Sequence, residues 1–152
     1  MLSMTDAEAI ALALQEAKEA AIRGEVPVGA VLLGPDGALL AQDGNRIVEY
    51  RDPTAHAEML VLRKGAAALG NERLTGAQLF VSLEPCAMCA GAMSLARVAR
   101  LVFVAQDPKG GAVISGPRFF EQATCHHRPV IARAGDAAAA GEMLKEFFRA
   151  RR

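Results

Sequence analysis

Two short segments of the chain carry three residues of types that bind zinc. His56 begins the tripeptide His56-Ala57-Glu58, and Cys86 and Cys89 form a C-x-x-C pair. A structural zinc site normally has four protein ligands, whereas a catalytic site has three and leaves the fourth position to water. One histidine and two cysteines therefore predict a catalytic site with one zinc ion per subunit.

A carboxylate follows the histidine at a spacing that suits acid–base chemistry. Glu58 lies two residues after His56, so it can reach a water molecule at the metal without binding the metal itself. The spacing H-x-E, followed by P-C-x-x-C, is typical of zinc enzymes that remove amino groups from nucleobases. Two thiolates balance the charge of Zn²⁺, which remains a Lewis acid. We expect hydrolytic deamination in which Glu58 transfers protons from water to a ring nitrogen and to the leaving ammonia.

The third cysteine leaves two alternatives open. A closed structural site would recruit Cys125 as a fourth ligand and would leave Glu58 as an ordinary surface acid. The tripeptide Cys125-His126-His127 also suggests a second metal site. In an extended segment, however, Cys125 and His127 face one side and His126 faces the other. We favour a packed cysteine with surface imidazoles.

The composition predicts one domain in a reducing compartment. The chain has 152 residues, of which 52% are apolar, so we expect a single domain over residues 1–152 with a substantial core. The formal net charge is zero, which argues against a general coat for nucleic acid but not against a local basic patch. Three cysteines, an odd number, fit a cytoplasmic protein, and we expect neither a signal peptide nor a membrane span.

Hydrophobic periodicity predicts a mixed order of helices and strands. Expected helices cover residues 6–23, 56–69 and 137–150, and a further helix has Pro85 in its first turn. Expected strands cover residues 28–33, 38–42, 78–83, 100–105 and 128–133, with a loop over residues 107–126. This order predicts an α/β fold with one sheet covered by helices. The zinc ligands would then lie at helix starts, where the helix dipole stabilises thiolates.

Five longer segments make the chain resemble a known family of enzymes. They are Glu25-Val-Pro-Val-Gly-Ala-Val31, Gly44-Asn45-Arg46, Asp52-Pro-Thr-Ala-His-Ala-Glu58, Leu83-Glu-Pro-Cys-Ala-Met-Cys-Ala-Gly-Ala-Met93 and Phe147-Phe-Arg-Ala-Arg-Arg152. Over nearly its whole length the chain resembles the bacterial tRNA adenosine deaminases, within the cytidine-deaminase-like superfamily. The zinc motif marks the superfamily, and the first and last segments indicate the tRNA enzymes.

The resemblance implies both a fold and an activity. The fold is a three-layer α-β-α arrangement of the cytidine-deaminase type, with a single mixed sheet of about five strands flanked by helices. The activity is conversion of the wobble adenosine of an arginine tRNA to inosine, with the anticodon stem-loop as the bound RNA. The resemblance also implies a homodimer whose sites lie near the interface.

The resemblance further implies roles for individual residues around the zinc site. Asn45 would hold the target nucleotide, the backbone of Ala57 would contact the base, and Glu84 would brace the site. Asp107 would contact the RNA strand beside the target, and Lys109 would meet a phosphate. Alternatives remain for three of them, since Asn45 and Asp107 could be turn residues and Lys109 could be a surface charge.

The end of the chain offers a candidate RNA contact. Phe147 and Phe148 are adjacent on the expected last helix, so they cannot both face the core. One would pack inside and the other would stack on a base beside the charges of Arg151 and Arg152. The alternative is two half-buried aromatic residues with solvated arginines. Residues 108–125 depart from the family pattern, which leaves the RNA contacts of that loop open.

Three functions compete on this evidence. The first is deamination of the wobble adenosine in tRNA, and the second is deamination of a free nucleobase or nucleoside such as guanine or cytosine. The zero net charge favours the second, whereas the Glu-Val-Pro-Val segment and the Phe-Phe-Arg terminus favour the first. The third is a zinc-stabilised tRNA-binding subunit without activity, in which we would expect Glu58 to be replaced.

Overall fold

The computed structural model of the chain describes residues 3–151. Its helices and strands, in chain order, are α1 (Asp6–Ile22), β1 (Gly29–Leu33), β2 (Leu39–Gly44), α2 (Ile47–Tyr50), α3 (Ala57–Leu69), β3 (Gln78–Leu83), α4 (Ala87–Ala96), β4 (Arg100–Ala105), the 3-10 helix η1 (Phe119–Glu121), β5 (Val130–Arg133) and α5 (Ala137–Arg149). Arg152 lies outside the described residues. Within residues 3–151 we find no helix that is both long and apolar enough to cross a membrane.

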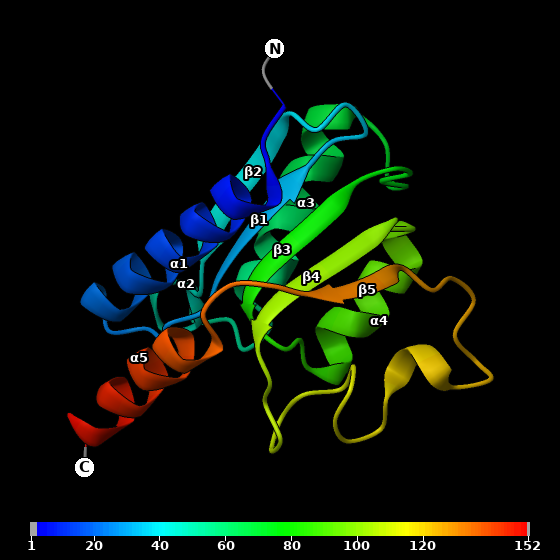
Figure 1. Ribbon diagram of the computed structural model, residues 1–152. Helices are drawn as coiled ribbons and strands as arrows, with labels where there is room; N and C mark the ends of the chain where they lie inside the picture. The colour runs from blue at the N-terminus through cyan, green and yellow to red at the C-terminus, as the bar shows by residue number, and fades with distance from the viewer. Residues whose placement is uncertain (1–2, 152) are drawn as a thin grey trace.

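One five-stranded sheet forms the middle of the molecule, in the order β2-β1-β3-β4-β5. Strand β1 runs antiparallel to β2 and β3, whereas β3, β4 and β5 are parallel to one another. Helices α1 and α5 lie on one face of the sheet, and α3 and α4 lie on the other (Figure 1). The expected three-layer α/β fold with one mixed sheet is therefore confirmed.

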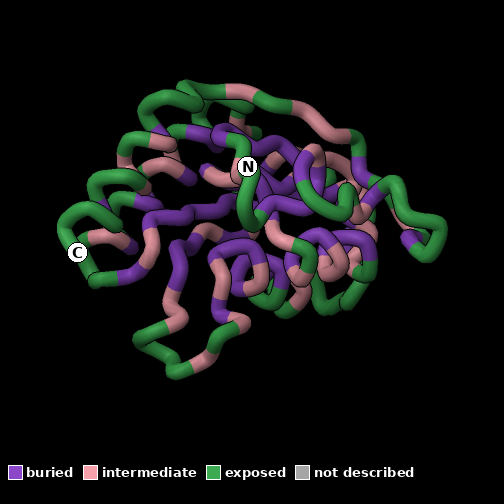
Figure 2. The backbone as a smooth tube through the Cα atoms, turned by 90° about the horizontal axis from the view of Figure 1, so that it is seen from below, coloured by how far each residue is buried: buried purple, intermediate pink, exposed green. Residues whose placement is uncertain are grey.

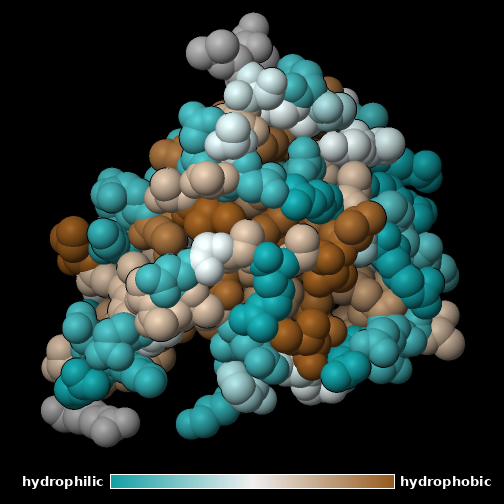
Figure 3. Space-filling view, viewed as in Figure 1, coloured by the Kyte–Doolittle hydropathy of each residue, from teal (hydrophilic) through white to brown (hydrophobic). Residues whose placement is uncertain are grey.

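The alternation of side chains along the strands gives each face of the sheet its own core. In β1, Ala30 and Leu32 pack with residues of α3 and α4, whereas Val31 and Leu33 pack with residues of α1 and α5. Figure 2 shows the buried residues concentrated in the middle of the molecule and the exposed ones on loops and outer helix surfaces. On the α1 face, apolar side chains reach the surface between polar ones (Figure 3).

The two helices behind the zinc motifs begin later than the sequence predicts. His56 is the N-cap of α3 (φ −71°, ψ 149°), so it precedes the first turn that holds Glu58. Cys86 is the N-cap of α4 (φ −75°, ψ 174°). The prediction that Pro85 lies in the first turn of this helix is wrong, because the chain is still extended at Cys86. The Pro85 carbonyl instead accepts a hydrogen bond from the N–H of Ala112.

Helix α2 is a single turn that the sequence pattern does not predict. It lies between β2 and α3 and ends at Arg51, whose backbone is left-handed (φ 51°). No side chain caps its first turn from the N-cap position, Arg46. Other contacts must therefore hold this segment beside the start of α3.

Candidate metal centre and cleft

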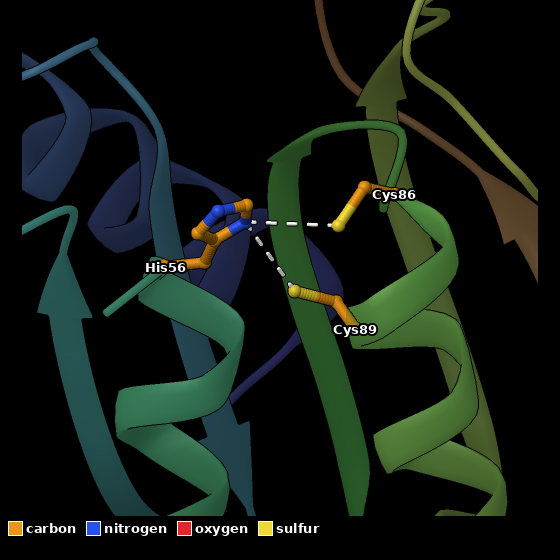
Figure 4. A group of neighbouring side chains, drawn as sticks. All are labelled: His56, Cys86 and Cys89. Atoms are coloured by element: carbon orange, nitrogen blue, oxygen red, sulfur yellow. Dashed lines mark hydrogen bonds between the residues drawn. The ribbon is translucent and has the colours of Figure 1, made fainter. Parts of the chain in front are cut away.

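The three expected zinc donors come together where α3 and α4 begin. The Nδ1 atom of His56 lies 3.7 Å from Sγ of Cys86 and 3.6 Å from Sγ of Cys89. Figure 4 shows the imidazole at the start of α3 and both sulfurs at the start of α4, pointing toward one another. Among residues 3–151, this is the one group of His, Cys, Asp and Glu side chains whose ligand atoms lie close enough together to bind a metal.

The donor set fits a tetrahedral zinc ion. Bonds of about 2.3 Å to sulfur and about 2.0–2.1 Å to nitrogen, at tetrahedral angles, place the two atoms about 3.6 Å apart. The two observed nitrogen–sulfur separations, 3.7 and 3.6 Å, match this value. Each half of the set lies at a helix N-terminus, where the positive end of the dipole favours thiolates. His56, Cys86 and Cys89 can therefore hold one zinc ion with three protein ligands.

Hydrogen bonds within the cluster distribute its protons unevenly. The pKa of Cys86 is lowered to about 4, chiefly because Cys89 forms a hydrogen bond to it. The pKa of Cys89 is raised by the same hydrogen bond, because the Cys89 thiol donates its own proton to the Cys86 thiolate. Hydrogen bonding to Cys86 also raises the pKa of His56. Binding of a metal at these atoms must therefore release the protons that the group retains.

Glu58 lies in the first turn of α3, beside the three donors. Its side chain is buried, with 3% of the residue exposed. Burial raises the pKa of its carboxyl to about 7. A carboxyl that titrates near neutral pH can both accept and return a proton during a reaction. The environment of Glu58 therefore suits acid–base chemistry.

A cleft of about 220 Å³ opens beside the cluster. Its walls are Val26, Val28, Asn45, Ile47, His56, Glu58, Leu83, Glu84, Cys86, Asp107 and Gly110. Pockets for drug-sized ligands span about 300–1,000 Å³, so this cleft suits a group as small as one base. The sequence did not mark the apolar walls Val26, Val28 and Ile47 as site residues. The Glu-Val-Pro-Val segment of the family pattern was the one indication of the first two.

Asn45 links the cleft to the start of α3. Its Oδ1 atom accepts a hydrogen bond from the N–H of Ala57 at 2.8 Å, and its own N–H donates to the carbonyl of Val28 at 3.1 Å. The Ala57 N–H is therefore engaged within the protein. The Nδ2 group of Asn45 makes no hydrogen bond to another of residues 3–151 and is not sealed from solvent. Asn45 thus has amide hydrogens to offer to a ligand in the cleft.

Glu84 holds the segment that follows β4. Its carboxylate accepts five hydrogen bonds of 2.8–3.0 Å, from the N–H groups of Asp107 and of residues 113–115 and from the Ser115 hydroxyl. Gly111 packs so closely here that an added Cβ would collide with the Glu84 carboxylate and the Asp107 carbonyl. The structure thus gives Glu84 a bracing position, with both oxygens already engaged.

Asp107 and Lys109 lie on the loop that Glu84 holds. Oδ1 of Asp107 accepts hydrogen bonds from the N–H groups of Lys109 at 3.2 Å and Gly110 at 3.0 Å, so the side chain closes a turn. Asp107 also lines the cleft. It can close the turn and still contact a ligand, because its Oδ2 atom takes no part in the turn. Lys109 is exposed and does not line the cleft.

The candidate RNA residues of the last helix have unequal positions. Phe147 is buried, with 8% of the residue exposed, whereas Phe148 is 50% exposed. The Arg151 guanidinium carbon lies 3.5 Å from the centre of the Phe147 ring, and its Nη1 donates to the Phe147 carbonyl at 3.2 Å. Arg151 therefore covers a core aromatic residue and the end of α5. Neither aromatic residue lines the cleft.

Cys125 is packed away from the metal group. Its thiol donates to the His127 carbonyl at 3.2 Å and contacts Oγ of Ser94 at 3.5 Å. His127 Nε2 lies 2.7 Å from the Val98 carbonyl, and His126 is exposed. Cys125 is therefore packed and His126 is at the surface, as the packed alternative predicts, whereas His127 is half-buried and hydrogen-bonded rather than a surface imidazole. These contacts argue against both the closed site and a second metal site.

A three-layer fold with one histidine, two cysteines and a buried glutamate at two helix starts defines a zinc deaminase. Residues 3–105 match the family model of the cytidine and deoxycytidylate deaminase zinc-binding region. The tRNA-specific adenosine deaminase of Agrobacterium fabrum is 55% identical over 141 residues, which cover 93% of this chain and 92% of that protein. The tRNA-specific adenosine deaminase of Aquifex aeolicus is 41% identical over 138 residues, which cover 91% and 90%.

A solved structure gives the same result. It comes from a study of A-to-I editing by tRNA:A34 deaminases at the wobble position of transfer RNA, and it superposes with a TM-score of 0.82 at 56% identity. The match covers 84% of this chain and 98% of that one. The chain belongs to the tRNA-specific adenosine deaminases of this zinc deaminase family.

Proposed function

We propose that the protein catalyses hydrolytic deamination of the wobble adenosine, position 34, of a transfer RNA to inosine. The observation that carries this proposal is the buried Glu58 carboxyl, with a pKa of about 7, beside three zinc donors in a cleft of about 220 Å³. The relatives from Agrobacterium fabrum and Aquifex aeolicus, which match over at least nine tenths of this chain and of their own length, are tRNA-specific adenosine deaminases. Arginine tRNA is the substrate that the sequence resemblance favours.

The reaction replaces the amino group on C6 of adenine by oxygen. A C6–O bond to water forms, the C6–N bond breaks and ammonia leaves. Glu58 accepts one proton of the water and delivers it to N1, then moves the second to the departing amine. His56, Cys86 and Cys89 would hold one zinc ion, which supplies Lewis acidity for the water.

The cleft favours a base that has been extruded from its strand. A deaminase cannot reach the reacting carbon of a stacked base, and an anticodon loop is already single-stranded, which lowers the cost of extrusion. Asn45 and Asp107 both line the cleft, so the Nδ2 group of Asn45 can donate to the nucleotide and the free Oδ2 of Asp107 can accept from the neighbouring RNA. The exposed ring of Phe148 can stack on a further base, and the exposed Lys109 can meet a phosphate.

We also infer a single-domain, cytoplasmic homodimer with one zinc ion per subunit. The family resemblance implies a dimer with the sites near the interface. Leu95 of α4 supports a contact on the α3–α4 side, because it is a large apolar side chain that is 77% exposed. The odd number of cysteines supports a reducing compartment.

One assay separates the proposed function from its competitors. Zinc-loaded protein is incubated with an arginine tRNA anticodon stem-loop, free adenosine, guanine or cytosine, and both ammonia and inosine are measured. We expect inosine at the wobble position of the stem-loop and little turnover of the free compounds. Turnover of guanine or cytosine with an inert stem-loop would establish a free-base deaminase, and binding of the stem-loop without ammonia would establish a non-enzymatic subunit.

A further inference from the structure

Glu25 is a buried carboxylate with no part in the chemistry described above. It follows α1 in the connection to β1, and only 2% of the residue is exposed. Its Oε1 accepts a hydrogen bond from the N–H of Val48 at 3.1 Å, and its Oε2 accepts one from the N–H of Glu49 at 2.9 Å. Both donors belong to the backbone of α2. A buried carboxylate that accepts hydrogen bonds from the backbone of a distant segment fixes the position of that segment.

The segment that Glu25 holds by hydrogen bonds, residues 45–49, forms part of one wall of the cleft. A single helical turn such as α2 is not stable by itself, because nucleation of a helix costs more than one turn returns. Ile47 of α2 and the nearby Asn45 line the cleft, as do Val26 and Val28, which lie one and three residues after Glu25. Glu25 thus joins two of the chain segments that line the cleft away from the metal ligands.

Arg23, two residues before Glu25, also contacts the segment from Asn45 to Glu49. Its Nη2 donates to the Asn45 carbonyl at 3.1 Å, and its Nε lies 3.8 Å from a Glu49 carboxylate oxygen. Gly24 between them has φ +87°, a conformation that L side chains rarely adopt, so the chain turns sharply at this point. The turn over residues 23–25 therefore contacts both ends of the segment from Asn45 to Glu49.

We propose that Glu25 is a positioning residue that pre-forms the base-binding wall of the cleft, and this inference rests on the deaminase function proposed above. With the carboxylate in place, Asn45 and Ile47 are already ordered when the base enters. Without it, substrate binding must order the 45–49 segment, and the base is held less accurately against Glu58. The cost of ordering this segment on binding raises KM, and misplacement by about 1 Å costs up to about 10²-fold in rate, so we expect kcat/KM to fall roughly 10- to 100-fold, with KM raised and kcat lowered.

The experiment compares Glu25→Gln and Glu25→Ala with Glu19→Gln in the full, zinc-loaded protein. Glu25→Gln keeps the size of the side chain but turns an NH₂ group toward a backbone N–H. Glu19 is an exposed acid of α1 without contact to the 45–49 segment, so Glu19→Gln makes the same charge change as a matched control. Glu25→Asp, one methylene shorter, tests partial rescue.

Three measurements are made on each variant. They are kcat and KM for the anticodon stem-loop, zinc content with the melting temperature, and hydrogen exchange of the Val48 and Glu49 amides. We expect Glu25→Gln to raise KM and to expose both amides while zinc content is unchanged, and Glu19→Gln to match the wild type. Normal kcat/KM in Glu25→Gln, amides that stay protected, or a loss of activity that follows loss of zinc would each overturn the proposal.

The test also separates this inference from the proposed function. If the wild type does not deaminate the stem-loop, the proposed function fails, and the kinetic comparison is made with whichever base the wild type turns over. If no base is turned over, the affinity for the stem-loop and the amide exchange decide the role of Glu25. Unchanged affinity together with protected amides would refute it.

Discussion

The two walls of the cleft are held by different kinds of interaction. On the metal wall, His56 and Cys86 each cap a helix that packs on the central sheet. On the opposite wall, the single turn α2 and the loop that follows β4 are held by two buried carboxylates, Glu25 and Glu84, which accept hydrogen bonds from backbone N–H groups. The chemistry thus rests on the framework of the fold, whereas the position of the base rests on single side chains. Substitutions on the metal wall should therefore impair the chemical step, whereas substitutions on the opposite wall should impair stability or binding of the base.

The largest effect is expected on the metal wall. Glu58→Ala should retain zinc and fold, because Glu58 is not one of the three metal donors. Loss of a general acid–base group costs about 10² to 10⁴ in rate, and Glu58 moves more than one proton here, so the loss should reach or exceed that range. Single-turnover release of ammonia measures it, with zinc content as the control. A variant with near-normal turnover would remove Glu58 from the mechanism.

On the opposite wall, we expect Glu84→Gln to destabilise the protein by about 1 to 3 kcal/mol, because one oxygen that accepts N–H donors is lost and those donors stay buried. Burial would raise the pKa of Glu84, but hydrogen bonds, led by that from the Asp107 N–H, outweigh it and the pKa is lowered from 4.5. A carboxyl with a lowered pKa contributes stability above its ordinary pKa, and that stability is lost as the pH falls through the lowered value.

Denaturant unfolding between neutral pH and pH values below 4.5 checks both parts of this prediction. The free energy of unfolding of the wild type should fall with the pH below the ordinary carboxyl pKa, and Glu84→Gln should show a weaker dependence. Zinc content at neutral pH should be equal in the two proteins. Parallel pH curves for the wild type and the variant would show that Glu84 does not hold the loop as a carboxylate.

The sequence predicted the metal wall far better than the opposite one. Strands 78–83 and 100–105 coincide with β3 and β4, because each is a short, mostly apolar segment. The start of α4 was predicted too early, because proline is most common at the first helical position, whereas Pro85 here precedes the N-cap residue Cys86. The contacts of Glu25 and Glu84 join residues more than 20 positions apart through backbone groups, and such contacts leave no spacing pattern in a sequence.

The smallest effects are expected at the end of the chain, where the sequence analysis predicted the same RNA-binding role for Arg151 and Arg152. Arg151 lies on the Phe147 ring, so Arg151→Ala should cost about 1 kcal/mol of stability through the lost cation–π contact. Arg152→Ala should reduce the slope of log affinity against log salt for the stem-loop by about one if its guanidinium meets a phosphate, as the sequence predicts. Thermal unfolding and salt titrations of the two single variants check this division. An equal loss of salt slope in both would make Arg151 a phosphate contact as well.

Metal-edge X-ray absorption of the zinc-loaded protein, together with elemental analysis, tests the open three-ligand metal wall most directly. We expect one zinc ion per chain, with one nitrogen donor from His56, two sulfur donors from Cys86 and Cys89, and one further light donor from solvent. The Cys125→Ser variant should give the same spectrum, because the Cys125 thiol contacts Ser94 and the His127 carbonyl. A third sulfur neighbour that disappears in Cys125→Ser would contradict the open site and the mechanism that depends on it.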